Sequence, residues 1–600
     1  MNRILWMIFL VCTSLVAAAQ SPQLEFVSQL GGTACSIDVA GTMIVLGQGP
    51  RLVMIDASDL ANPIEIGRSA PIANCIEDLD VVDGYAYAAA DLHGVFIFSL
   101  QDPAHPVVVG SMPAQDAALS VCVVGEMAYV ADRYEGLSVF SLADKTAPVR
   151  MGWIDTPGRA SDVAVVGDYA YVADGSSGLR VIAIADPSSL VEVAVLDSLD
   201  GAVALSIRDH VITVVDENSR FHTVSITDPE HPVLLATVAV RYPVDVIVMG
   251  EYACVSSNYR GIHVLSIADP AHPTEVGMID AQGEALAVVD GSLCVAAGAR
   301  GLTVYSLEDP SAPTVSAVLD TAFAGTSVDA SADLVCVADY YEGVRILSTA
   351  DSMQPVEIGF FALPEATTVD LDGNRLFVCA ARELVIVDLA DPTTPVELGR
   401  VAFSARPTSV QAVGGFAYVV CSTDGLHVIS VADPAVPTLV ASLPMDGYAM
   451  DVCVAGEVAF VAAKGLHIVS MADPLHPLQI GTLASNQPAR SVTITGDVVF
   501  LSEGSLVRVI FVSDPAHPVE VGQRIFGLGA AVAIAGGTAV VGLEWVGVRL
   551  VSLLDLSNLP VLGGADTADR AVDIAIWGDL VYVADDRGGL TVLRLVAAGN

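Results

Sequence analysis

The stretch LVIVDLADPTTPVELG, residues 384–399, decides the fold because variations on it fill most of the 600-residue chain. It joins an alternating apolar segment, an Asp-Pro turn and a second apolar segment that follows another proline. A repeat of 40 to 43 residues is typical of proteins in which each repeat is one supersecondary unit. The Asp of the turn recurs at that spacing, at Asp59, Asp102, Asp144, Asp186, Asp228, Asp269, Asp309, Asp351, Asp391, Asp433, Asp473, Asp514 and Asp555.

The turn has a local physical explanation. The Asp side chain accepts hydrogen bonds from backbone N–H groups just downstream, and the following Pro presets φ. The second Pro begins the next strand, where no donor is required. A histidine recurs in several turns, and one His per repeat does not make a metal site, so we interpret these side chains as solvated turn residues: His105, His231, His272, His476 and His517.

Four short alternating segments can be read in each repeat, for example 120–124, 128–132, 137–142 and 149–152. Val, Ile, Tyr and Phe dominate them, and Gly, Asp and Pro separate them, which is the chemistry of strands and turns. Four strands per repeat of this length indicate the blade of a β-propeller. The predicted fold class is therefore all-β, with tandem propellers built from about fourteen four-stranded blades.

Fourteen blades exceed one ring, because propellers typically hold four to eight. Two rings of seven is the simplest division, and six plus eight is the alternative. We expect a signal peptide at residues 1–19, a first propeller at 20–309 and a second at 310–600. The segment from Leu24 to Leu30 is expected to complete the first ring as an outer strand, and Thr314–Leu319 to complete the second.

The N-terminus predicts export. Arg3 precedes an apolar run that is too short to span a bilayer, and Ala17-Ala18-Ala19 follows it, so we expect cleavage after Ala19. The mature chain is then secreted, periplasmic or at the cell surface, with no transmembrane segment. Its nine remaining cysteines alternate with valines, which favours buried thiols. Cys35 and Cys75 occupy the same place in neighbouring repeats, but inner strands usually lie too far apart for a disulfide.

Charge narrows the classes of partner. The formal net charge is −44, and the only lysines are Lys145 and Lys464. Such a surface repels nucleic acid and anionic lipid. Cations, basic proteins and neutral glycans stay open as partners, and solubility in a salty medium is an equally good explanation of the acidity. We expect a monomer whose partner is an extracellular protein or glycan.

The repeat resembles the LVIVD family of secreted and cell-surface proteins of bacteria and archaea, whose five name letters stand at Leu384 to Asp388. The resemblance covers essentially the whole mature chain. It implies a propeller outside the cytoplasm and no established activity.

Strand direction alternates, so the Asp-Pro turns share one rim with the turns between the first and second strands of each blade. The opposite rim carries the hairpins between the second and third strands. Acidic residues end the second strand in four consecutive blades, at Asp91, Asp132, Asp174 and Asp216. They are interpreted either as Asx-type turns that close the hairpins or as an acidic arc for a cation or basic ligand.

Aromatic residues recur near the hairpin glycines, at Tyr134, Tyr259, Tyr341 and Trp545. Loop-tip aromatics anchor proteins or sugars, although packing on an adjacent loop is the alternative. The innermost strand repeats a polar position that is expected to satisfy neighbouring backbone groups. Its acidic members are Asp38, Asp80, Asp162, Asp245, Asp451 and Asp573.

No catalytic motif occurs, whether G-x-S-x-G, H-E-x-x-H, a phosphate loop or an EF-hand. We expect no catalytic residue, no metal site and no cofactor, with a surface cation such as Ca²⁺ left open. The sequence favours a non-catalytic extracellular binding or scaffolding module. The competing class is a propeller enzyme, a hydrolase or lyase with a site in one channel mouth.

Overall fold

The computed structural model describes residues 23–596 except positions 73, 258–259, 282, 320–321, 332, 351–354, 486, 528, 544–546 and 568. These residues form fourteen antiparallel sheets of four strands each. No α-helix occurs in the described parts of the chain, and the one short 3₁₀ turn there is η1 (Asp197–Leu199). The all-β prediction is confirmed.

Thirteen of the sheets each consist of one repeat, as the blade containing LVIVD shows. Its strands are β34 (Ala366–Asp372), β35 (Arg375–Ala380), β36 (Glu383–Asp388) and β37 (Val396–Ala402), paired in that order. The LVIVD letters lie in β36, and the Asp-Pro turn joins β36 to β37. In the third repeat the four predicted segments correspond to β10 (Ala118–Val124), β11 (Met127–Asp132), β12 (Leu137–Ser141) and β13 (Val149–Ile154).

The chain divides into two compact units. The N-terminal unit comprises Leu30–Ala324 together with Asp586–Gly589. Its seven innermost strands contact one another in chain order, and the last contacts the first, so the circuit closes. These strands are β2 (Ala34–Ala40), β6 (Asp78–Val82), β10, β14 (Asp162–Val166), β18 (Ala202–Arg208), β22 (Pro243–Met249) and β26 (Ala285–Val289).

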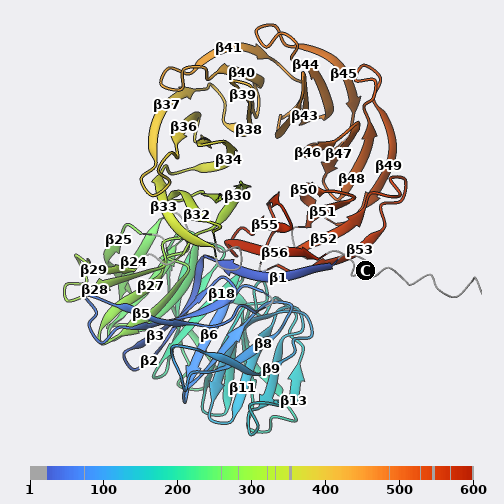
Figure 1. Ribbon diagram of the computed structural model, residues 1–600. Coiled ribbons are helices and arrows are strands. Elements are labelled where there is room, and N and C mark those ends of the chain that lie inside the picture. Colours follow the sequence, from blue (N-terminus) through green and yellow to red (C-terminus); the bar gives the residue numbers. More distant parts are fainter. Residues whose placement is uncertain are drawn as a thin grey trace, which may run out of the picture. The chain divides into compact units, whose positions relative to one another are not determined.

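The C-terminal unit contains Gly325–Asp585, β56 (Leu590–Val596) and residues 23–29. Its innermost strands also form a closed circuit, drawn in yellow to red in Figure 1. The last sheet is completed by the N-terminal strand β1 (Gln23–Leu30), which pairs with β56. The seven innermost strands are β30 (Gly325–Ala330), β34, β38 (Pro407–Val413), β42 (Asp451–Ala455), β46 (Ala489–Thr495), β50 (Gly529–Ala535) and β54 (Asp573–Trp577).

Two details differ from the expectation drawn from the repeat spacing. The units divide between Ala324 and Gly325, not after Asp309. The two strands expected to complete the rings are also exchanged. Thr314–Leu319 is β29, the outer strand of its own repeat in the N-terminal unit, and β1 completes the C-terminal unit. The physical reason is that the sheets from β2 to β29 each obtain all four strands from consecutive chain, whereas β54, β55 and β56 form three strands of a sheet whose edge is paired by β1.

The core lies between blades. Phe377, Leu384 and Ile386 of one blade pack on Val410 and Val419 of the next, and all are buried. Burial of each such side chain contributes roughly 1.5–3 kcal/mol. Because each sheet has a neighbour on both faces, both faces of the middle strands are apolar. Cysteines share this environment: none of the nine described cysteines is in a disulfide, and seven are buried.

Candidate functional site

The rim of Asp-Pro turns is built by its own hydrogen bonds. Asp391 Oδ1 accepts from the backbone N–H of Thr393 at 3.1 Å and from its hydroxyl at 2.7 Å. These bonds favour the ionised carboxylate and lower the pKa of Asp391. Turns with histidine add a bond between the ring Nδ1 and the Asp, 2.8 Å long for His476 and Asp473. The predicted turn chemistry is confirmed, and it belongs to the framework.

On the opposite rim, three of the four residues of the predicted acidic arc are buried with no exposed surface: Asp132, Asp174 and Asp216. Asp132 accepts three backbone N–H bonds, from Gln115 at 2.7 Å, Asp116 at 3.0 Å and Ala117 at 2.9 Å. All three donors lie in the connection that enters its blade. The carboxylate therefore supports that connection and is closed to a ligand.

The other two carboxylates have different partners but the same role. Asp174 accepts from the Thr156 hydroxyl at 2.6 Å and from the Gly158 N–H at 2.9 Å, and burial raises the pKa of Asp174. Asp216 accepts from the backbone and guanidinium of Arg220 and lies 2.9 Å from His222 Nε2. These contacts argue against an acidic arc, because the three carboxylates are buried and already accept hydrogen bonds from groups of the protein.

Asp91 is separate from these three. Its backbone has a positive φ of 46°, and its half-buried carboxylate forms an ion pair with Arg133. Arg133 also lies 3.8 Å from Asp116. The charge of Asp91 is therefore neutralised within the rim.

Buried ion pairs explain why acidic residues recur at this position. In three blades an Arg on the third strand lies beside the hairpin acid and a Glu on the outer strand. Arg508, for example, contacts Glu503 at 3.0 Å and Glu520 at 2.5 Å. Breaking a buried pair costs far more than the pair contributes, so these positions are structural. The sequence signal is an Arg at the second or third position of a third strand that begins with Leu or Gly.

The predicted aromatic residues have different outcomes. Tyr134 is 64% exposed and Tyr341 is 47% exposed. The rings of Tyr340 and Tyr341 pack edge to face, with centroids 5.5 Å apart. Tyr259 and Trp545 lie outside the described residues. Tyr134 directly precedes Glu135, which lines a hollow in the surface.

That hollow contains a residue that the repeat pattern did not single out, Trp153 of β13. The Trp153 side chain is 48% exposed, and its indole N–H donates to the carbonyl oxygen of Glu135 at 2.6 Å. The residues that line an open groove of about 440 Å³ are Gln115, Glu135, Arg150, Met151, Gly152 and Trp153. A tryptophan at an outward position of an outer strand is the signal that could have found it.

The innermost strands carry the repeated acidic position, and its carboxylates cross to the next blade. Asp245 Oδ2 accepts from the N–H of Leu286 at 2.8 Å. Asp370, an inner-strand acid outside the predicted set, accepts from the N–H of Ala412 at 2.8 Å in the same way. Asp573 bonds to Val328 and thereby joins the last blade of its unit to the first. The prediction that this position satisfies neighbouring backbone is confirmed.

Burial at this position shifts the titration of several carboxyls. It raises the pKa of Asp38 to about 7, that of Asp245 to about 6 and that of Asp370 to about 8. The charge of Asp329 raises the pKa of Asp370 further. Among the acids that join inner strands, Asp38, Asp245 and Asp370 therefore have pKa values near neutral pH.

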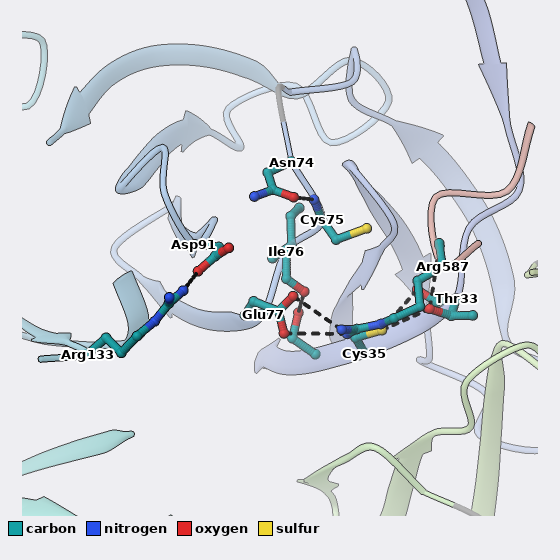
Figure 2. A network of polar contacts seen from close by, with 10 residues as sticks. Thr33, Cys35, Asn74, Cys75, Ile76, Glu77, Asp91, Arg133 and Arg587 are labelled. Carbon is teal, nitrogen blue, oxygen red and sulfur yellow. Dashed lines mark hydrogen bonds and ion pairs between the residues drawn. The ribbon is translucent and has the colours of Figure 1, made fainter. Parts of the chain in front are cut away.

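A second polar network surrounds Arg587 in the N-terminal unit (Figure 2). The guanidinium of Arg587 lies 3.3 Å from Glu77, and its backbone oxygen accepts the N–H of Thr33 at 2.7 Å. The thiol of Cys35 lies 3.0 Å from the Thr33 hydroxyl, and burial raises the pKa of Cys35. A thiol with a raised pKa is a poor nucleophile, so we assign no catalytic role to Cys35. The network instead stabilises the backbone at Thr33, just before β2 begins.

No group of three or more His, Cys, Asp or Glu side chains among the described residues is arranged to hold a metal ion. Across the same residues, no helix is long and apolar enough to cross a membrane.

Comparison with known proteins agrees with the repeat architecture. The LVIVD repeat profile matches residues 31–70, 116–156, 157–197, 241–281, 365–402, 406–443, 446–484, 488–524 and 568–593. The chain belongs to the LVIVD repeat family. The segments between these matches, such as 71–115 and 198–240, fold into the same four-stranded sheets, so the LVIVD architecture extends beyond the matched repeats.

No curated protein matches this LVIVD protein in sequence. Among solved structures it is similar to PorZ, an essential bacterial surface component of the type-IX secretion system of Porphyromonas gingivalis. The TM-score is 0.57 at 12% identity, with 94% of this chain and 86% of PorZ covered. At this identity the similarity shows a shared propeller-like fold.

Proposed function

We propose that this protein is exported and acts outside the cytoplasm as a non-catalytic binding or scaffolding module for a protein or glycan. One observation carries the proposal. Polar positions that recur from blade to blade bond within the framework, as at Asp132, Asp174 and Asp370, whereas Trp153 is exposed in a groove. The similarity to PorZ, itself a bacterial surface component, supports a place at the cell surface.

The test combines location with partner capture. Cells that produce the full chain fused to a proximity-biotinylating enzyme are fractionated, and biotinylated molecules are identified. We expect the mature protein in the periplasmic, surface or medium fraction, with a reproducible set of exported neighbours. An uncleaved chain in the cytoplasm would contradict the proposal.

The competing enzyme proposal has its own test. Screening of the purified protein against ester, phosphate, glycoside and uronate substrates is expected to give no turnover above background. Turnover that is lost in Asp370→Asn would favour a hydrolase or lyase in the channel, because Asp370 is the inner-strand acid whose pKa reaches about 8.

A further inference from the structure

We infer that the groove beside Trp153 is a binding site for a neutral saccharide. This inference rests on the proposed binding function and names the ligand class. The groove lies entirely within one blade of the N-terminal unit and the connection that enters that blade. Its aromatic wall comes from β13, and its polar wall comes from Glu135 of the hairpin and Gln115 of the connection.

The tryptophan ring is held in place before any ligand arrives. Its N–H bond to the Glu135 carbonyl fixes one edge, and the guanidinium carbon of Arg150 lies 5.6 Å from the ring centroid. Nevertheless, 48% of the side chain is exposed. Because the ring is already fixed, less conformational entropy is lost when a ligand binds to it. The C–H face of a pyranose ring packs well on such a platform.

The polar side chains of the groove fit hydroxyl groups. Glu135 supplies carboxylate acceptors, Arg150 supplies guanidinium donors, and Gln115 supplies both an acceptor and a donor. A sugar hydroxyl both donates and accepts, so it can bond to all three residues. The guanidinium and the carboxylate balance each other within the groove, whereas the whole chain carries a net charge of −44. A neutral ligand is favoured because an anionic one would be repelled at long range.

Size separates a saccharide from a protein partner. The groove volume of about 440 Å³ is within the usual range of small-ligand sites, roughly 300–1,000 Å³. A stable protein interface needs about 800 Å² on each partner, which is far more than this groove offers. Tyr134 is 64% exposed and precedes Glu135 in the same hairpin, but the residues that line the groove do not include it.

The test titrates the full mature chain with neutral trisaccharides: cellotriose, chitotriose, maltotriose and mannotriose. Trigalacturonic acid is the anionic comparison. Binding is followed by calorimetry and by tryptophan fluorescence. We expect at least one neutral trisaccharide to bind, trigalacturonic acid to bind more weakly, and Trp153→Ala to weaken binding at least about tenfold.

The matched control is Trp577→Ala. Trp577 is 49% exposed, ends strand β54 and lies in the other unit, so its removal should leave the affinity within about twofold of the wild type. Glu135→Gln should weaken binding severalfold while circular dichroism and the melting temperature stay unchanged.

Three outcomes would overturn the inference: no neutral trisaccharide binds at millimolar concentration, Trp153→Ala binds as well as the wild type, or the anionic trisaccharide binds best. If partner capture succeeds while the titrations fail, the saccharide site is wrong and the proposed function stands. If the chain stays in the cytoplasm, the proposed function fails whatever the titrations show.

Discussion

Gly359 of β33 (Val356–Ala362) lies directly beneath Pro392 of the following repeat, so that a Cβ on Gly359 would overlap the Pro392 carbonyl oxygen. Pro392 belongs to LVIVDLADPTTPVELG, and Gly399 at the end of that stretch lies beneath Pro434 in the same way. The stretch therefore supplies a turn, at Pro392, that covers the glycine of the preceding blade. It also supplies a glycine, Gly399, that is covered by the turn of the following blade. The motif is the device by which adjacent blades interlock.

This contact predicts the effect of larger side chains. Gly359→Val should destabilise the C-terminal unit by about 1–3 kcal/mol, because the turn above it must move. Gly359→Ala should cost less, since the same position holds Ala194, Ala236, Ala317 and Ala441 in other blades. Urea unfolding followed by circular dichroism measures both effects.

The chain provides a matched control for this experiment. Gly563 occupies the same position in the thirteenth blade, but nothing lies within 4 Å of its added Cβ, because in the neighbouring sheet β56 and β1 come from distant parts of the chain and no Asp-Pro turn joins them. Gly563→Val should leave the free energy of unfolding almost unchanged. Equal effects at Gly359 and Gly563 would show that the turn does not restrict this position.

The pairing of β1 with β56 predicts that removal of β1 affects only the C-terminal unit. A chain that begins at Leu30 lacks most of β1 and leaves the edge of β56 unpaired, so amide hydrogens of β56 should exchange faster than in a chain that begins at Gln23. Amides of the inner strands β6 and β10 should exchange at unchanged rates. Hydrogen exchange read by mass spectrometry distinguishes this result from a general loss of stability.

Asp370 predicts a pH dependence with a defined sign. Its pKa of about 8 in the folded chain lies above the unfolded value of about 4, so the stability it contributes is full below pH 4 and is lost as pH rises through 8. The C-terminal unit should therefore lose stability between these values. Asp370→Asn keeps an oxygen acceptor for Ala412 and should remove part of that loss, on the order of 1–3 kcal/mol.

The control for this pH series is Asp391→Asn. The pKa of Asp391 is lowered by hydrogen bonds from Thr393, so its contribution is lost on acidification and not on alkalinisation. Urea midpoints of Asp391→Asn should follow the wild type between pH 5 and 8, apart from a constant offset. A flat profile for the wild type would rule out the assignment to Asp370.

The three hydrogen bonds to Asp132 predict that its substitution lowers the free energy of unfolding. Asp132→Ala leaves three backbone N–H groups without their acceptor and should destabilise the N-terminal unit by on the order of 3 kcal/mol. Asp91→Ala should cost less than about 1 kcal/mol, because that ion pair is only half-buried.

Calcium titration of the four-site Asn variant of Asp91, Asp132, Asp174 and Asp216 should match that of the wild type. Saturable heat of binding in the wild type alone would show that these carboxylates do bind a cation.

The strand pattern, the turn chemistry and the family resemblance were predictable because each depends on neighbours within one repeat. The predicted segments in the third repeat agree with β10–β13 to within two residues. The groove at Trp153 was not predictable in the same way. Its walls come from residues 115, 135 and 150–153, and only the folded blade brings these together. For the same reason the sequence pattern of the hairpin carboxylates is compatible with a ligand site, whereas in the folded chain backbone N–H groups such as those of residues 115–117 bond to them.

From sequence alone, the chain is determined to be a series of four-stranded sheets, because alternation, Asp-Pro turns and glycine spacing act over distances of a few residues. Tertiary structure alone decided which unit β1 completes and which polar side chains face inward. Pairing of β1 with β56 joins residues more than 500 positions apart, and the burial of Asp132 depends on a connection folded over it. Such contacts depend on which edges and loops are left unsatisfied once every repeat has folded, and no single repeat carries that information.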